Sequence, residues 1–171
     1  MHLHSSETHK MTTDADFRYL TNFHALDITA RKLSGITSEA FRYLSNLQSL
    51  NAAKCRKNLD AILYHLTNLR SLNIQDCRRE TITDESFRNL VNLQTLNMFR
   101  CRWSSITNEA FCHLTNLQNL DMAFCDQSTI TDDAFSHLTN LKSLKIWACN
   151  QSTITNEAFQ HFGSLTFLNM E

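Results

Sequence analysis

Five cysteines recur at one position of a repeating sequence, and their chemistry is the first thing to explain. Each lies a whole repeat away from the next, whereas zinc sites gather thiolates from close pairs such as C-x-x-C. Neighbouring strands lie roughly 4.8 Å apart, a distance that a disulfide between column cysteines could span. Their side chains would point in parallel directions, however, which opposes the geometry of a disulfide. We interpret the column as buried thiols bonded to the backbone of a turn, and we predict no metal and no cofactor. The column consists of Cys55, Cys77, Cys101, Cys125 and Cys149.

A second column carries imidazoles at His65, His113, His137 and His161. Consecutive imidazoles could bind a transition metal, but a solvated helix face explains them equally well, and no carboxylate repeats beside them. The chain contains no G-x-S-x-G, P-loop or H-E-x-x-H motif. Acidic pairs such as Asp84-Glu85 fall at expected helix starts, where capping and the helix dipole account for them. The sequence therefore predicts a protein that is not an enzyme.

These columns belong to an internal repeat. The dipeptide Ile-Thr recurs at a constant interval, at Ile82, Ile106, Ile130 and Ile154. Self-similarity predicts a single domain over residues 12–171 with about seven copies, the first degenerate and the last incomplete. The copy around Leu59 is two residues short. Residues 1–11 form an N-terminal extension or partial cap.

Two periodicities alternate within each copy. The stretch Leu117-x-x-Leu120-x-Met122 has the period of two of a short strand. Residues 107–114 place apolar side chains on one side, as a short helix would, with Thr107 as the expected N-cap. No single copy can bury its apolar side alone, so stacking must create one core and one parallel sheet. Proline is absent and glycine occurs twice, and the asparagine that precedes each strand is expected to supply the turn chemistry instead.

The spacing L-x-x-L-x-L-x-x-C is specific, as in Leu93-Leu96-Met98-Cys101 and Leu141-Leu144-Ile146-Cys149. It resembles the leucine-rich repeat, in particular the cysteine-containing subclass, although the unit here is slightly short for that subclass. The resemblance implies an α/β fold: a curved right-handed solenoid with parallel strands on its concave side and short helices on its convex side. It also implies a recognition surface without naming what is recognised.

Composition limits the function classes further. The chain has 171 residues and a formal net charge of −1, which argues against general nucleic-acid binding. No apolar run is long enough to cross a membrane, and no apolar signal segment opens the chain. Six cysteines without an export signal favour reduced thiols and a cytoplasmic protein. Among them Cys112 should be exposed on the convex side, and therefore reactive.

A partner-binding surface follows from strand alternation, because residues between the buried ones point out of the concave face. Most are small or polar, and two are large aromatics. Another aromatic, Trp103, lies in the loop after Cys101. For Trp103 and for Phe124, a ring exposed to a partner and a ring packed against the edge of the solenoid are equally favoured. Clustered exposed aromatics are typical of binding hot spots. The predicted partner-binding residues are Asn73, Gln75, Asn97, Phe99, Asp121, Ala123, Phe124, Lys145 and Trp147.

The loops after the early strands are basic, whereas the later loops are not. Residues 1–102 contain 14 basic and 10 acidic residues, and residues 103–171 contain 2 and 7. A basic ridge would attract an acidic protein or a phosphorylated ligand, although loop tips are commonly charged without function. Nucleic acid is less favoured, since no aromatics interleave with the basic residues in sequence. The predicted basic edge comprises Arg56, Lys57, Arg78, Arg79, Arg100 and Arg102.

The leading hypothesis is a non-catalytic protein–protein interaction module that binds a protein partner through the concave strands. One alternative is the substrate-recognition fragment of an F-box-like ubiquitin-ligase adaptor, because cysteine-containing repeats resemble those of F-box proteins. Another is a self-assembling structural solenoid. The sequence stops within the last strand, which also predicts a homodimer through an uncapped C-terminal edge.

Overall fold

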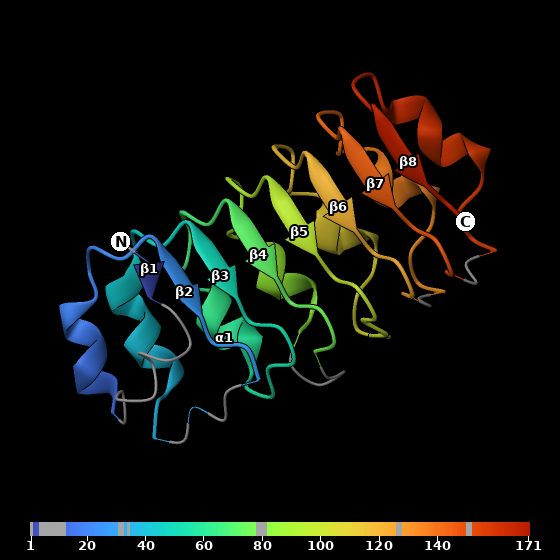
Figure 1. Ribbon diagram of the computed structural model, residues 1–171. Coiled ribbons are helices and arrows are strands. Elements are labelled where there is room, and N and C mark those ends of the chain that lie inside the picture. The colour runs from blue at the N-terminus through green and yellow to red at the C-terminus, as the bar shows by residue number, and fades with distance from the viewer. Residues whose placement is uncertain are drawn as a thin grey trace.

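Eight short parallel strands form one sheet in the order β1 to β8, so each strand pairs with its neighbours in sequence (Figure 1). The structure is a computed structural model. It describes the backbone of residues 2–3, and the chain at 13–30, 33, 35–77, 82–125, 128–149 and 152–171. The strands are β1 (His2–Leu3), β2 (Ala25–Asp27), β3 (Ser49–Asn51), β4 (Ser71–Asn73), β5 (Thr95–Asn97), β6 (Asn119–Asp121), β7 (Ser143–Lys145) and β8 (Phe167–Asn169).

Strands β2 to β8 fall one in each predicted copy, and β1 comes from the N-terminal extension. Equivalent residues are aligned across the sheet without a shift, so Leu72 pairs with Leu96 and Leu96 with Leu120. The short copy keeps this register, because Leu50 pairs with Leu72. The two-residue shortening of this copy therefore lies outside its strand.

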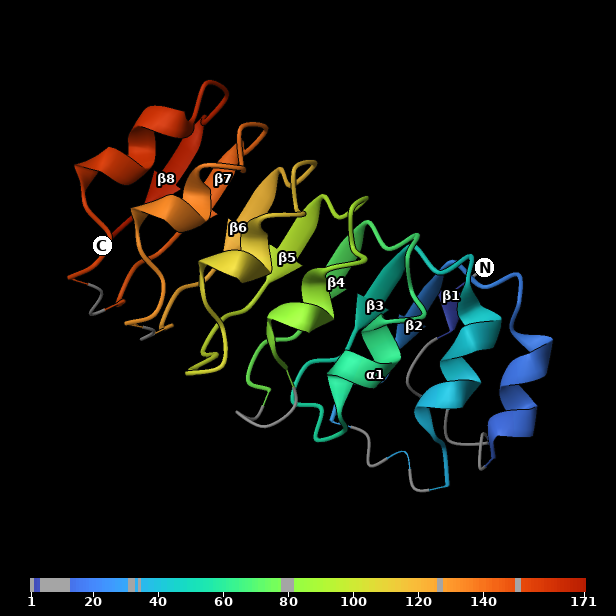
Figure 2. The same ribbon diagram turned by 180° about the vertical axis from the view of Figure 1, so that it is seen from behind.

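The helices lie behind the strands in Figure 1 and in front of them in the reverse view (Figure 2), and they form the convex layer of a curved solenoid. The predicted architecture is thus confirmed. Most are 3-10 helices of four to seven residues, as is common for helical pieces this short. An α-helix occurs in the short copy. In the described chain the helices are η2 (Asp14–Tyr19), η3 (Ser38–Leu44), α1 (Leu59–Leu63), η4 (Asp84–Phe87), η5 (Asn108–Phe111), η6 (Asp132–Phe135) and η7 (Asn156–His161).

Asn58 is the N-cap of α1, and a threonine is the N-cap of each 3-10 helix in the described chain, as the sequence predicted for Thr107. Its side-chain oxygen accepts a hydrogen bond from the Glu109 backbone N–H at 3.2 Å. The same threonine is also held by the copy before it: the Asp84 carboxylate accepts from the Thr107 N–H at 2.8 Å and from its hydroxyl at 2.7 Å. Asp132 makes the same pair of bonds to Thr155. The carboxylates at helix starts thus join adjacent repeats.

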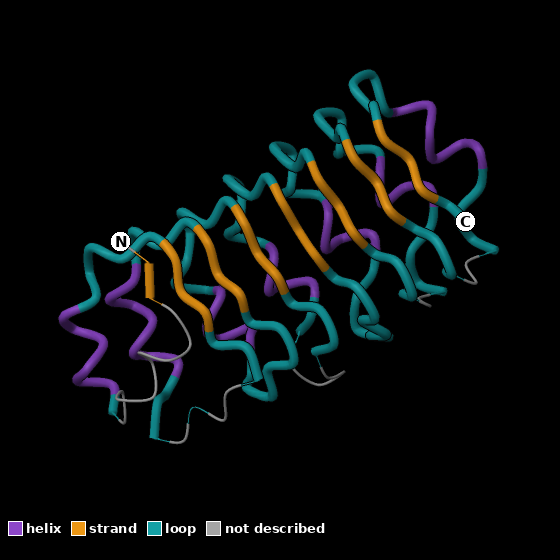
Figure 3. The backbone as a smooth tube through the Cα atoms, viewed as in Figure 1, coloured by secondary structure: helices purple, strands orange, loops and turns teal. Residues whose placement is uncertain are grey.

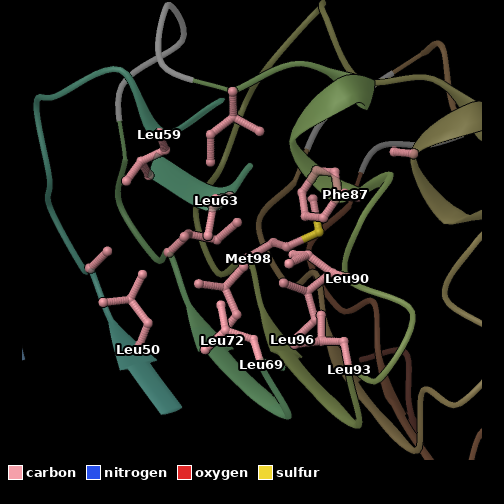
Figure 4. Close-up of a cluster of buried hydrophobic side chains, with 14 of the residues drawn as sticks. Leu50, Leu59, Leu63, Leu69, Leu72, Phe87, Leu90, Leu93, Leu96 and Met98 are labelled. Carbon is pink, nitrogen blue, oxygen red and sulfur yellow. The ribbon is translucent and has the colours of Figure 1, made fainter. Parts of the chain in front are cut away.

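The core is a continuous column of side chains between sheet and helices (Figure 4). Leu69, Leu72, Leu93 and Leu96 approach from the strand side and Phe87 from the helix side, all buried. Figure 3 shows the regular alternation of strand, loop and helix that produces this packing. Because each copy contributes equivalent apolar side chains, the core runs along the stack of copies.

The asparagine before each strand bonds across repeats. Asn116 Nδ2 donates to the Val91 carbonyl at 2.9 Å, and Asn140 Nδ2 donates to the Thr115 carbonyl at 2.9 Å. These asparagines were predicted to hydrogen-bond backbone groups of the turn. Each one donates its side-chain amide to a backbone carbonyl of the preceding copy, so the bonds form a ladder along the stack. The same bond is made by Asn46, Asn68 and Asn92.

The turn itself depends on the mid-strand asparagine and a left-handed residue. Asn97 Oδ1 accepts from the Phe99 N–H at 2.9 Å, and the following residue, Arg100, has φ 59°. The Arg100 N–H donates to the Ala123 carbonyl at 3.0 Å, so backbone hydrogen bonds between adjacent copies continue beyond the end of the strand. A non-glycine residue in this conformation costs about 1–2 kcal/mol. Non-glycine residues with positive φ are Ala30, Leu33, Lys54, Asp76, Arg100, Phe124 and Ala148.

The two last strands differ in burial. Leu144 on β7 is 0% exposed, whereas Leu168 at the equivalent place on β8 is 41% exposed. Phe167 and Met170 are also exposed. None of the helices in the described chain has the length and apolar character of a membrane span.

Leu144→Ala should lower the free energy of unfolding by about 2–5 kcal/mol, because it opens a cavity among fully buried neighbours. Leu168→Ala removes the same atoms from a half-solvated site and should cost less than about 1 kcal/mol. Urea unfolding followed by circular dichroism measures both. Equal losses would show that the core is as tight at β8 as at β7.

Candidate binding surface

Four of the five cysteines in the column are buried, as predicted: Cys55, Cys77, Cys101 and Cys125. The Cys101 thiol donates to the Ile74 carbonyl at 3.1 Å, and the Cys125 thiol to the Met98 carbonyl at 3.0 Å. Cys77 and Cys149 make the same bond to the copy before them. Burial raises the pKa of the Cys77 thiol to about 12 and raises the pKa of Cys101 and Cys125 as well. These thiols are structural donors.

Two residues depart from this pattern. The prediction of burial is wrong for Cys149, which is half-buried. Cys112 lies at the C-cap of η5 and is partly exposed. Burial, followed by the nearby Glu109 carboxylate, raises the pKa of the Cys112 thiol. Access therefore distinguishes Cys112 from the column.

The histidine column lies on the convex side, where His113 and His137 are exposed. His65 Nε2 lies 3.9 Å from Glu39 Oε1. Over the residues that the structure places, no three histidine, cysteine or acidic side chains gather as a metal site would require.

Polar side chains fill the middle of the concave face, as predicted. Asn73 and Asn97 are half-buried, because each accepts a bond from the turn two residues on. Asp121 accepts in the same way from the Ala123 N–H and also lies 3.4 Å from Lys145 Nζ. A hollow of about 260 Å³ lies over β5, β6 and β7, lined in part by Asn97, Asp121 and Lys145.

Three aromatic rings meet at the edge where β5, β6 and β7 end. The Phe124 ring lies 4.5 Å from the Trp147 ring and 5.4 Å from the Phe99 ring, both at steep angles. Phe99 and Trp147 come from copies two strands apart, yet their centroids are 6.4 Å apart. Two strand spacings amount to roughly 9.6 Å, so these rings lean toward one another. We name Phe99, Phe124 and Trp147 the aromatic cluster; all three are half-buried.

Ala123 was predicted to face a partner, and this prediction is wrong. Its side chain is 0% exposed. It sits in the copy between Phe99 and Trp147, whose rings lean together across that copy. Ala53, at the equivalent place after β3, is buried too, at 3% exposed, so a small side chain here lies below its neighbours even without rings beside it. Alternation gives the direction of a side chain, but it takes no account of neighbours large enough to cover a small residue.

Trp103, for which exposure and packing were weighed equally, belongs to the core. It is 0% exposed, and its indole N–H donates to the Cys77 carbonyl at 3.2 Å. A loop tryptophan that both fills space and finds an acceptor is well suited to burial.

The basic edge is described in part, since Arg78 and Arg79 lie outside the described residues. Arg56, Arg100 and Arg102 are exposed. Lys57 is half-buried, and its ammonium donates to the Ile36 carbonyl at 3.1 Å, so it closes a loop in addition to carrying charge.

Two features were missed by sequence reasoning. The Arg100 guanidinium carbon lies 5.2 Å from the Phe99 ring centre and 5.3 Å from that of Phe124, so the basic edge and the aromatic cluster touch. Neither residue type alone signals this contact, which depends on the turn. The second feature is a convex hollow of about 710 Å³ beside α1, lined in part by Glu39 and Tyr64. The two-residue shortening of that copy is its sequence signal.

The repeat, its register and its two ladders can now be compared with known proteins. A family model described as "BspA type Leucine rich repeat region" matches residues 10–123 and 57–171, with six copies. The chain belongs to the BspA-type leucine-rich repeat family. The leucine-rich repeat resemblance is therefore confirmed, while the cysteine-containing subclass stays a prediction. A comparison with curated protein sequences gives no significant match.

Solved structures share the leucine-rich repeat fold. The structure described as "Crystal structure of TLR13-ssRNA13 complex" is 22% identical, with a TM-score of 0.78 over 99% of this chain and 26% of that one. The glycosylated form of the Toll–Spatzle complex of Drosophila is 16% identical, with a TM-score of 0.73 over 94% of this chain and 25% of that one. The chain spans about a quarter of these relatives, and the likeness shows the fold alone.

A thiol reagent at pH 8 should label Cys112 first, since a thiol must be accessible to react. Cys149 should follow slowly, and Cys101 and Cys125 should react only when the chain unfolds. Mass spectrometry of the labelled peptides over time measures the order, and Cys112→Ser should remove the fast phase. Fast labelling of Cys101 in the native protein would contradict its burial.

Proposed function

We propose that this leucine-rich repeat domain is a non-catalytic module that binds a protein partner through the concave face of its strands. The partner-binding surface is the polar column of Asn73, Asn97, Asp121 and Lys145, together with the aromatic cluster. Cytoplasmic location remains part of the proposal and rests on the reduced cysteine column.

The aromatic cluster is the observation that carries this proposal. Three large rings gather at one place on an otherwise small and polar face, where folding alone would favour polar side chains. Partly exposed aromatics grouped in this way are the usual anchors of protein interfaces. The hollow beside them, over β5 to β7, offers polar groups that would orient a bound chain.

The fold neighbours are consistent with a binding role. Two of them are named as a complex of Toll with Spatzle and one as a complex of TLR13 with single-stranded RNA. Those ligands belong to those proteins. For this chain we favour a protein, because its net charge is −1 and the concave column includes the Asp121 carboxylate.

The F-box-like adaptor and the self-assembling solenoid are alternatives within the same proposal. The exposed Phe167 and Leu168 on β8 favour the second, because exposed apolar side chains can pack against another copy. Sedimentation across a concentration series distinguishes it: self-assembly requires a mass that rises with concentration and falls in a Leu168→Lys variant.

A photo-cross-linking side chain at Asn119, which is exposed on the concave face, should capture a partner from a cell extract. The same group in place of Tyr64, which is 67% exposed on the convex face, is the matched control. Adducts should form at Asn119, be absent at Tyr64, and disappear in a Trp147→Ala background. Once the partner is purified, Trp147→Ala should weaken binding about thirtyfold, or about 2 kcal/mol.

Trp147→Ala should change the midpoint of thermal unfolding little, because its ring is at the surface edge and not between the layers. Adducts at Tyr64 alone would move the interface to the convex face and contradict the proposal.

A further inference from the structure

Phe124 adopts a backbone conformation that does not suit it. Its φ is 59°, in the left-handed region that favours glycine and is unfavourable for a bulky side chain. The same place in the other copies is held by residues such as Lys54, Asp76 and Ala148, also left-handed. The Phe124 N–H donates to the Trp147 carbonyl at 3.0 Å, a bond that glycine would make equally well. The backbone conformation and its hydrogen bond therefore do not require phenylalanine at this position.

The position of the ring is what phenylalanine adds. Phe124 packs against Trp147 at 4.5 Å and against Phe99 at 5.4 Å, and it stays half-buried. The Phe99 and Trp147 rings lie 6.4 Å apart, and without Phe124 they would lack the ring that packs against both of them. Strained residues that persist at a surface are characteristic of functional sites.

Arg100, the left-handed residue of the preceding copy, completes the same patch. Its guanidinium carbon lies over both the Phe99 and Phe124 rings, within 5.3 Å of each centre. No carboxylate in the described part of the chain lies within salt-bridge distance of Arg100, Arg56 or Arg102. An arginine that lies over aromatic rings, with no salt bridge to an acidic side chain in the described part of the chain, can receive a carboxylate bidentately.

We propose that Phe99, Arg100, Phe124 and Trp147 form one subsite, which takes an apolar side chain lying next to a carboxylate in an acidic, extended segment of a protein partner. The rings contact the apolar side chain and Arg100 pairs with the carboxylate. Arg102 and Arg56 extend the positive charge along the same edge. This inference rests on the proposed function and adds the chemistry of the bound segment.

Single-stranded nucleic acid is the competing ligand, because arginines and aromatics together can hold bases and phosphates. The sequence shows no interleaving of the two residue types, but the structure brings Arg100 onto the rings. The observations still favour a peptide. Arg100 covers faces of Phe99 and Phe124 that a base would need, and the rings meet at 84° instead of forming a flat platform.

The test uses a displayed library of random twelve-residue peptides, selected on the full chain alone, and the selected peptides are then assayed on Phe124→Gly. Glycine suits the left-handed backbone at this position, so this variant removes the ring without backbone strain. Ala30→Gly is the matched control, since it relieves the same conformation four copies before Phe124 and removes no charge. A fluorescent mixed-sequence oligoribonucleotide of twelve nucleotides is the second probe. Thermal unfolding of each variant shows that it is folded.

Selected peptides should place a large apolar residue within two positions of Asp or Glu. Phe124→Gly should bind them at least tenfold more weakly, with an unfolding midpoint equal to or above that of the natural chain, whereas Ala30→Gly should bind unchanged. Replacing the peptide carboxylate by its amide should weaken binding to the natural chain about tenfold and leave binding to Arg100→Gln unchanged. This non-additivity would show that the two groups are in contact.

Four results would overturn the inference: peptides without an acidic residue, additive effects of the amide and of Arg100→Gln, tight binding of the oligoribonucleotide through Phe124, or a loss of folding in Phe124→Gly. If the peptides instead depend on Asn97 or Lys145 and not on Phe124, the subsite is wrong while the concave-face function stands. If binding depends on neither group, and cross-links form at Tyr64, the proposed function has failed as well.

Discussion

Each copy of the repeat depends on carbonyl groups that belong to the copy before it. The Asn116 amide, the Cys125 thiol and the backbone N–H groups that enter each strand all donate to the preceding turn of the solenoid. A buried carbonyl without a donor is costly, so these bonds constrain the sequence at fixed positions. Repeat length, the asparagine and cysteine columns and the shared core all follow from the need to place these donors in register.

The same constraint explains what the sequence could reveal. Anything dictated by the stacking is repeated five or more times and can be read by eye: the strand leucines, the cysteine column and the helix-start threonines. Features that occur once could not be read in this way. Ala123 is buried between copies that carry large rings, and Trp103 enters the core from a loop position that holds Arg79, Gln127 and Gln151 in the sequences of the equivalent copies. The contact of Arg100 with Phe99 and Phe124 requires the backbone angle of a turn, which residue types do not encode directly.

The turns show a division between folding and surface chemistry. Their hydrogen bonds need a mid-strand asparagine or aspartate and a left-handed residue, but they do not need any particular side chain at the left-handed place. Glycine would make the turn at lower cost, yet the column contains Lys54, Asp76, Arg100 and Phe124. The side chains at this edge are therefore free to vary among copies, and the edge can carry a distinct set of charges and rings while the scaffold stays constant.

The short copy introduces a different property. From α1 onward, a polar side chain at each helix start holds the threonine of the next copy, as Asp84 holds Thr107, but no such bond joins η3 to α1 in the described chain. The hollow of about 710 Å³ opens at this junction. In a linear array the free energy is a sum of repeat and nearest-neighbour contributions, so cooperativity is weakest where neighbours share least. The sheet pairing of β3 with β4 is intact across this junction, but its helix layer is the least connected. We therefore expect the stack to open first between η3 and α1, with the copies before α1 unfolding while the aromatic edge, carried by β5 to β7, remains folded.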